Sequence, residues 1–563
     1  MSVVRPKRTV SALPSAVSAR FSKVPPAPVS VGRAHALDVP FEYRAVASAA
    51  GARWDEAHKV FVYRGAELPA ELAPFRSQPY SHERRVEARI NDPQGTGKRA
   101  ASQPAGNIVP RAHQLDAMRA VALAHGSDHP GFLLADDVGL GKTISAWGAV
   151  LRMAHAETVL VVCPLAVVAH WRRTIEAMGD GGKDVVVMNY ERVGKLFEVA
   201  PAARAKVKSK KGLAKVGTAE GFDVVVWDES HRLKNPTAAR SKLAAKINGQ
   251  AGFVLWLSAT AGQNPLELSY LAALLASVSG DKASDLKAFE LWCMKQGLGV
   301  TRGAFGKWDW RGDPKDCELV RALLFDGRVP AGIRRRPEDI VGWPELNRML
   351  VPIGLEGEAR ALYAQAWTEF RKALELDPQG KNPKGALAAT LRLRQKGSLL
   401  RVPGTVELAQ ELLDNGHQVA ISVAFMETLT TLQAALAAAG CAVIHGQLAA
   451  ADKERERLRF QRGEARVVLF TVEEGISLHQ GEHNDVVRSE VIHDLRWSAI
   501  QMAQIEGRCH RDGKFAQVYW TYADDTIEAR IAQIVCGRIT SMKGMIGDDT
   551  ATLKEIDAAL RAG

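Results

Sequence analysis

The feature that most constrains the fold is two separate series of short apolar runs, each run followed by a helical pattern. The first series lies between residues 131 and 258 and reads GFLLA, ETVLVVCP, DVVVMN, FDVVVWD and GFVLWLS. The second lies between residues 418 and 522 and reads QVAISVAF, CAVIH, RVVLFT, EVIHDL and VYWTY. Near-continuous apolar runs are typical of strands buried on both faces of a parallel sheet. The chain is therefore predicted to be an α/β protein with two parallel sheets.

The segments around these two series indicate further parts of the chain. Residues 1–37 contain several basic residues and prolines but no acidic residue. This composition predicts a flexible basic arm, although a transit peptide has a similar composition. Residues 41–63 predict a short helix that stops at Gly51, followed by a hairpin. The predicted division is a basic arm (1–37), a small N-terminal module (38–90), a linker (91–105), a first lobe (106–275), a helical bridging region (276–403), a second lobe (404–535) and a C-terminal helical tail (536–563).

Composition narrows the classes of function. With 46% apolar and 24% charged residues, the 563-residue chain has the composition of a globular protein. Its net charge of +11 favours polyanionic partners such as nucleic acid, with a dispersed solubilising charge as the alternative. The six cysteines form no C-x-x-C pair, which argues against a zinc ribbon or a disulfide framework. The most apolar stretch, from Thr158, is too short to span a membrane and contains Pro164.

A glycine-containing loop follows the first apolar run. It reads Asp136-Asp137-Val138-Gly139-Leu140-Gly141-Lys142-Thr143 and leads into a helical pattern. Two glycines let such a loop curl, so that backbone N–H groups and the helix N-terminus face a triphosphate. Lys142 adds positive charge there, and the Thr143 hydroxyl can hold Mg²⁺. The general pattern G-x-x-x-x-G-K-[ST] has glycine where this chain has Asp136, and a simple strand-to-helix turn is the structural alternative.

Two further patterns carry chemistry. The run VVVWDESH ends a buried strand in Asp228 and Glu229, which could hold Mg²⁺ and orient an attacking water. Near the C-terminus, Arg508 and Arg511 are three residues apart, which would place them on one face of a helical turn. Two such guanidinium groups could stabilise a transferring phosphate. If they reach the phosphate loop from the second lobe, the nucleotide binds between the two lobes.

A basic run without acidic residues extends from Ala203 to Gly217. It is either a solvated loop between strands or a loop that contacts nucleic-acid phosphates. In the second interpretation the contacts come from Lys208, Lys210 and Lys211.

Together these motifs resemble those of superfamily-two helicases, and within them the Swi/Snf family of double-stranded-DNA translocases, in a compact bacterial or phage-like form. The resemblance covers residues 108–531. LADDVGLGKT is similar to the family's first motif, including its aspartate, and DESH to the D-E-x-H box. LSATAGQN at Leu257 resembles motif III, with Ala261 where proline is usual, and Asp494 to Trp497 matches D-x-x-W. Motif V departs from the family, because Glu473 and Glu474 stand where small residues are usual.

The resemblance implies two tandem RecA-like lobes, ATP and Mg²⁺ as cofactors, and roles for individual residues. It assigns catalysis to Lys142, Asp228, Glu229, Arg508 and Arg511, and the metal to Thr143 and Asp228. Nucleotide binding is assigned to Gln114 as the adenine-reading glutamine and to Asp137, Gly139, Gly141, Lys142, Thr143 and Gln504. DNA contact is assigned to Pro164, His170, Trp171, Asn264 and Trp497.

The implied function is a DNA-dependent ATPase that moves along duplex or forked DNA as a monomer, with single-stranded DNA as a further implied partner. The N-terminal module is loosely similar to the accessory domain of annealing helicases, with a small packing hairpin as the alternative. Two rivals remain, a strand-separating DNA or RNA helicase and a nucleic-acid-binding scaffold without hydrolysis. A cytoplasmic protein is expected, or a nuclear one in a eukaryote, with no membrane partner.

Overall fold

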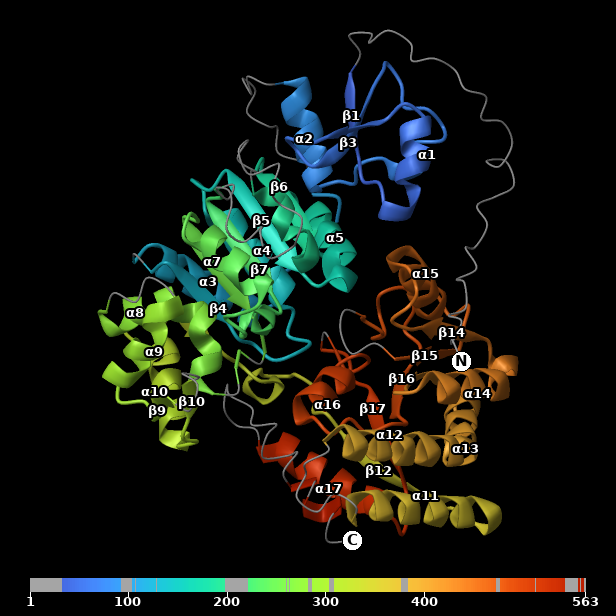
Figure 1. Ribbon diagram of the computed structural model, residues 1–563. Coiled ribbons are helices and arrows are strands. Elements are labelled where there is room, and N and C mark those ends of the chain that lie inside the picture. Colours follow the sequence, from blue (N-terminus) through green and yellow to red (C-terminus); the bar gives the residue numbers. More distant parts are fainter. Residues whose placement is uncertain are drawn as a thin grey trace, which may run out of the picture.

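The computed structural model describes most of the chain in two lobes and an N-terminal module (Figure 1). Each lobe contains a six-stranded sheet in which every paired strand is parallel. The α/β prediction with two parallel-sheet lobes is therefore confirmed. The described residues are 33–92, 104–106, 108–127, 129–197, 221–259, 261–262, 264–281, 286–302, 308–375, 383–471, 476–511, 513–541, 555–556 and 558–560.

The first lobe has the strand order β11-β4-β8-β7-β5-β6. Its strands are β4 (Gly131–Leu134), β5 (Thr158–Cys163), β6 (Asp184–Asn189), β7 (Val224–Asp228), β8 (Phe253–Leu257) and β11 (Gly332–Ile333). The five apolar runs predicted as strands are β4 to β8. Its helices are α3 (Ala112–His125), α4 (Lys142–Arg152), α5 (Val168–Met178), α7 (Ala239–Asn248) and the 3₁₀ helices η3 (Leu165–Val167), η4 (Tyr190–Leu196), η6 (Ser230–Leu233) and η7 (Pro265–Leu271).

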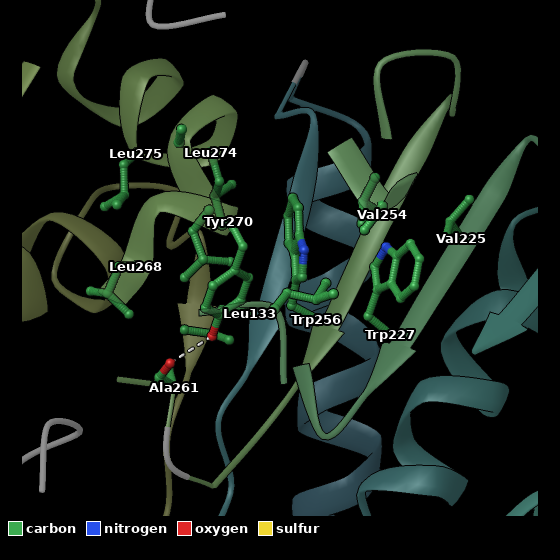
Figure 2. Close-up of a cluster of buried hydrophobic side chains, with 14 of the residues drawn as sticks. Leu133, Val225, Trp227, Val254, Trp256, Ala261, Leu268, Tyr270, Leu274 and Leu275 are labelled. Atoms are coloured by element: carbon green, nitrogen blue, oxygen red, sulfur yellow. Dashed lines mark hydrogen bonds between the residues drawn. The ribbon is translucent and has the colours of Figure 1, made fainter. Parts of the chain in front are cut away.

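Two tryptophans on neighbouring strands fill the core beneath one face of this sheet (Figure 2). Trp227 on β7 lies opposite Trp256 on β8, and both are fully buried. Trp227 donates its indole N–H to the Asn248 side chain at 2.7 Å. Tyr270 closes the cluster and donates its hydroxyl to the Ala261 carbonyl at 2.9 Å. This packing fixes the carboxyl ends of β7 and β8, where parallel α/β sheets place their ligand sites.

The second lobe has the strand order β12-β17-β16-β13-β15-β14. The strands are β12 (Arg348–Ile353), β13 (Gln418–Ser422), β14 (Cys441–Ile444), β15 (Val467–Phe470), β16 (Arg488–Ile492) and β17 (Gln517–Ala523). Its helices are α11 (Gly357–Glu375), α12 (Pro383–Leu400), α13 (Val402–Asp414), α14 (Met426–Ala435), α15 (Ala450–Gln461), α16 (Ala499–Glu506), α17 (Ile527–Ser541) and the 3₁₀ helix η10 (Ala437–Ala439). As predicted, the helical stretch before β14 stops at Gly440, whose φ of +71° is left-handed.

The predicted bridging region (276–403) is divided between the two lobes. The helices α8 (Ala272–Ser279), α9 (Leu286–Lys295) and α10 (Pro314–Phe325) pack on the core of the first lobe beside the hairpin of β9 (Val300–Arg302) and β10 (Trp308–Trp310). β11 then joins the first sheet, and α11 and α12 pack on the second core. The prediction of a separate bridging region was wrong, because a short edge strand such as β11 contains too few apolar residues to be recognised in the sequence. The predicted tail boundary at 536 also falls inside α17.

The N-terminal module is a three-stranded antiparallel sheet with the order β1-β3-β2. It contains β1 (Ala34–Leu37), β2 (Arg53–Asp55), β3 (Val60–Arg64), α1 (Arg44–Ala49), α2 (His82–Asn91) and the 3₁₀ helices η1 (Phe41–Tyr43) and η2 (Ala73–Phe75). The predicted helix, the stop at Gly51 and the hairpin are confirmed. The arm predicted for 1–37 extends too far, because β1 pairs with β3, and Asn91 belongs to α2 and not to the linker.

This module is fixed to the edge of the first lobe. The backbone N–H of Val187, on edge strand β6, donates to the Tyr80 carbonyl at 2.7 Å. Arg192 donates to both carboxylate oxygens of Asp38, at 2.8 and 2.9 Å, and also pairs with the buried Glu83. The module thereby covers part of an edge that would otherwise expose unpaired backbone groups. Within the described residues, no helix has the length and apolar character needed to cross a bilayer.

Candidate phosphate-binding site between the lobes

The glycine-containing loop connects β4 directly to α4, which begins at Lys142. Gly139 and Gly141 have φ values of +89° and +77°, a conformation that side-chain-bearing residues rarely adopt. The Lys142 amine donates to the Asp136 and Asp137 carbonyls at 2.7 and 3.2 Å. The loop is therefore curled around the lysine at the N-terminus of a helix, which is an arrangement suited to an anion.

Two arginines hold the loop from a distant part of the chain. Asp136 is fully buried and accepts from the Arg335 side chain and from the Arg335 backbone N–H at 3.0 Å. Asp137 pairs with Arg334 at 3.3 Å. Burial raises the pKa of Asp137 despite the positive charges of Arg334 and Lys142. The loop aspartates thus make structural ion pairs with arginines that no sequence motif of the loop predicts.

Gln114, the predicted adenine-reading residue, lies directly against the loop. Its side chain accepts from the Arg111 N–H at 2.9 Å and donates to the Leu140 carbonyl at 3.3 Å. The side chain is buried, and a Cβ atom on Gly141 would lie 2.3 Å from its amide nitrogen. A side chain at position 141 would therefore displace the Gln114 amide, in addition to straining the left-handed backbone.

Asp228 and Glu229 lie at the carboxyl end of β7, as predicted. The Asp228 carboxylate accepts from the Trp171 indole at 2.8 Å and from the Glu229 N–H at 3.0 Å. Burial raises the pKa of Asp228, and the neighbouring Glu229 charge raises it further. Burial acts in the same direction on Glu229, but His231, 3.3 Å away, and the charges of Lys142 and Arg508 outweigh it and lower the pKa of Glu229.

Asp228, which is buried, and Glu229, which is half-buried, thus form a carboxylate pair that can stabilise added positive charge. Thr143 is the second residue of α4, and with Asp228 it offers one hydroxyl and one carboxylate. Such a small set fits Mg²⁺, which is usually held by one or two protein oxygens together with phosphate and water. No cluster of three His, Cys, Asp or Glu side chains that could bind a metal by itself occurs among the described residues.

The second lobe contributes Arg508 and Arg511 from the turn after α16. The prediction that they share a helical face is wrong, because the helix ends at Glu506 with Gly507 as its C-cap. Arg508 is buried and donates to the Ile476 carbonyl at 3.1 Å. A Cβ atom on Gly139 would lie 3.5 Å from the Arg511 side chain. Arg511 therefore lies at the phosphate loop, and Arg508 is close enough to Glu229 for its charge to contribute to lowering the pKa of that carboxyl.

Other contacts join the lobes around this point. A Cβ atom on Gly507 would lie 2.9 Å from the Val138 side chain, so the arginine turn is seated on the loop itself. Arg173 on α5 pairs with Glu454 on α15. Gln504, the remaining predicted nucleotide-binding residue, is buried on α16.

The residues predicted to contact DNA differ in burial and in their contacts. Trp171 is fully buried and bonded to Asp228, so its prediction as a DNA contact is wrong; it supports the carboxylate pair instead. Pro164 is buried at the end of β5. His170 is partly buried, and burial together with the charges of Arg511 and Arg173 lowers its pKa to about 4.

The remaining predicted contacts lie on other elements. The Asn264 side chain accepts from the Glu267 N–H and caps η7. Trp497 is partly buried, with the Arg394 guanidinium 4.8 Å from its ring. Lys208, Lys210 and Lys211 lie outside the described residues, as do Glu473 and Glu474.

Comparison with protein families identifies the class. Residues 113–395 match the SNF2-related domain, and residues 404–513 match the helicase conserved C-terminal domain. Because the first match alone covers half of the chain, the chain belongs to the SNF2-related family. The predicted Swi/Snf resemblance is confirmed, and the predicted class of superfamily-two ATPase agrees with both matches.

Several curated proteins are similar to this chain. The SWI/SNF-related matrix-associated actin-dependent regulator of chromatin subfamily A-like protein 1 of Xenopus tropicalis is 26% identical over 69% of this chain and 40% of its own length. The DNA annealing helicase and endonuclease ZRANB3 of Mus musculus is 24% identical over 70% of this chain and 37% of its own length. A protein of Mycoplasma pneumoniae described as an uncharacterized ATP-dependent helicase is 24% identical over 72% of this chain and 39% of its own length.

The chain spans about two fifths of the length of these curated relatives. Among solved structures, the Sulfolobus solfataricus SWI2/SNF2 ATPase core in complex with dsDNA is 17% identical, with a TM-score of 0.33. That match covers 81% of this chain and 97% of the other.

Proposed function

We propose that this protein is an ATP-driven motor that moves along duplex DNA. The observation that carries the proposal is the meeting of the two lobes at one site. Arg511 lies against Gly139 of the phosphate loop, and the charge of Arg508 acts on Glu229. A site built from both lobes couples the state of the nucleotide to the relative position of the lobes.

Each group at this site has a role in phosphoryl transfer. Lys142, the loop glycines and the N-terminus of α4 bind the phosphates, and Gln114 reads the adenine. Thr143 and Asp228 would hold Mg²⁺, which would neutralise phosphate charge when bound. Glu229 orients the attacking water, since its lowered pKa keeps it ionised and able to accept a hydrogen bond. Arg508 and Arg511 stabilise the charge that develops on the transferred phosphate.

DNA is the proposed track because the chain has a net charge of +11 and its relatives include a protein named as a DNA annealing helicase. Contacts to backbone phosphates would make binding tolerant of sequence and sensitive to salt. His170, Asn264, Trp497 and the lysines at 208, 210 and 211 remain candidate contacts. We propose a monomer that acts in the cytoplasm, with Mycoplasma relatives as support for a bacterial setting.

Steady-state ATP hydrolysis tests this function, measured at low salt without nucleic acid and with duplex, forked or single-stranded DNA or RNA. Duplex DNA should stimulate hydrolysis most, without release of a strand. Lys142→Ala should reduce turnover by at least about a hundredfold, because the amine that binds phosphate is lost. Lys242→Ala, at an exposed lysine on α7 of the same lobe, is the matched control and should retain wild-type turnover.

Other outcomes would favour the rivals. Stimulation mainly by single strands or RNA, together with strand release, would favour a strand-separating helicase. Binding without hydrolysis under every condition would contradict the motor and favour a scaffold.

A further inference from the structure

A carboxyl side chain lies in the interior of the second lobe, directly behind the arginine turn. Glu490 is on β16, between β13 and β17, and is fully buried. An acidic side chain in the middle of a sheet is costly unless it is neutral or hydrogen-bonded. Its retention there calls for a specific contact.

That contact is with the turn that carries the arginines. The Glu490 carboxyl accepts a hydrogen bond from the Cys509 backbone N–H at 3.0 Å. Cys509 directly follows Arg508, and the Arg508 carbonyl accepts from the Leu478 N–H at 2.9 Å. Beyond the end of α16 at Glu506, the Arg508 N–H still donates back to the Ile505 carbonyl at 3.0 Å. Cys509 is bonded to the sheet instead, because Glu490 accepts its N–H.

The charges around Glu490 are compatible with this role. Arg508, Glu506 and Cys509 are the ionisable groups that act on it. Glu506 is paired with Arg348 and accepts from the Trp520 indole at 2.9 Å. Burial raises the pKa of Glu490 to about 8, so the group is mostly neutral at pH 7. A neutral carboxyl can accept the Cys509 N–H without neutralising Arg508, which also faces Glu229 across the lobes.

We propose that Glu490 is a positioning residue for ATP hydrolysis: its carboxyl holds the turn that carries Arg508 and that places Arg511 against the phosphate loop. The inference rests on the proposed ATPase function and adds a residue that acts through Arg508 and Arg511. Glu490 does not touch the reacting atoms, so it affects the transition state only through the arginines it positions.

The test compares Glu490→Ala and Glu490→Gln with wild type in the full chain. Glu490→Ala should lower kcat by about tenfold and change the KM for ATP by less than about threefold, because the arginines act mainly in the transition state. Glu490→Gln retains an acceptor for the Cys509 N–H, and its kcat at pH 7 should stay within about threefold of wild type.

The control is Gln418→Ala, which removes bonds to the Phe460 and Ala465 carbonyls from an equally buried site on the neighbouring β13. It should lower the melting temperature and leave kcat unchanged.

The pH profile gives a readout that a merely structural role would not change. Wild-type kcat should fall as pH rises through about 8, since ionised Glu490 then offsets the Arg508 charge. Glu490→Gln cannot ionise and should lack this fall. If Glu490→Ala does not fold, the profile of the glutamine variant decides by itself.

The outcomes separate this inference from the function on which it rests. An active wild type whose kcat and pH profile are unchanged in both Glu490 variants would overturn the role of Glu490 and leave the motor intact. An inactive wild type would overturn both. A loss of kcat in Gln418→Ala equal to that in Glu490→Ala would show that general destabilisation, not positioning, is responsible, and would also overturn the inference.

Discussion

The two halves of the site are held in place in different ways. In the first lobe, the loop is continuous with β4 and α4, and its aspartates pair with Arg334 and Arg335. In the second lobe, the arginines lie in a turn beyond the end of α16, supported by Glu490 and by the Ile476 carbonyl. The half proposed to bind phosphate is thus a fixed half, held by ion pairs, whereas the half that carries the arginines is held by hydrogen bonds.

The largest expected effect comes from breaking the support of the fixed half. Arg335→Ala leaves Asp136, which is fully buried, without its main partner. Loss of one member of a buried ion pair costs about 3–5 kcal/mol of folding free energy. Denaturant unfolding measures this loss. The neighbouring Arg336 pairs with Glu338 and Asp339 at the surface, so Arg336→Ala should cost less than about 1 kcal/mol. Equal losses in the two variants would contradict the supporting role of Arg335.

An intermediate effect is expected at the carboxylate pair. Trp171→Phe removes the indole N–H that donates to Asp228, and should cost about 1–3 kcal/mol of stability. It should also lower turnover about five- to tenfold, since Asp228 loses an orienting bond worth roughly 1 kcal/mol. ATP hydrolysis and thermal unfolding are measured on the same samples. Trp147→Phe is the matched control, because this equally buried indole donates to the Gly179 carbonyl, away from the carboxylates. Trp147→Phe should lower stability without lowering turnover. Equal turnover in the two variants would show that Trp171 has no role at the site.

The smallest effect is expected where the lobes meet at the surface. Arg173 and Glu454 form an ion pair between α5 and α15, with side chains 46% and 28% exposed. Exposed ion pairs contribute about 0–1 kcal/mol to stability. A double-mutant cycle of Arg173→Ala and Glu454→Ala should therefore give a coupling free energy in that range. The coupling should be smaller at high salt, because salt screens exposed charges. A coupling above about 2 kcal/mol would mean that this pair, and not the arginine turn, dominates contact between the lobes.

Much of the fold could be predicted because its signal is local. The ten apolar runs predicted as strands became β4 to β8 and β13 to β17, since a strand buried on both faces consists mainly of apolar residues. The edge strands β1, β11 and β12 were missed. They are short or partly exposed, and pairing with a neighbour defines them more than their own sequence does.

The supporting contacts of the site were harder to predict. Arg335 lies 199 residues from Asp136, and no spacing rule links them. Trp171 gives the same sequence signal whether it is buried against Asp228 or exposed to DNA. The helical face assumed for Arg508 and Arg511 is the one error that the sequence could have prevented, since Gly507 before Arg508 is a common helix stop.

The central claim is that one chain supplies both halves of one ATP site, and mixing two inactive variants tests it most directly. Lys142→Ala removes the phosphate-binding amine of the first lobe, and Arg508→Ala removes a guanidinium of the second. ATP hydrolysis on duplex DNA is measured for wild type, for each variant alone and for the equimolar mixture. An active wild type, two inactive variants and an equally inactive mixture are predicted, because no chain in the mixture has a complete site. Recovery of about a quarter or more of wild-type activity on mixing would show that the halves come from different chains, and would contradict the account.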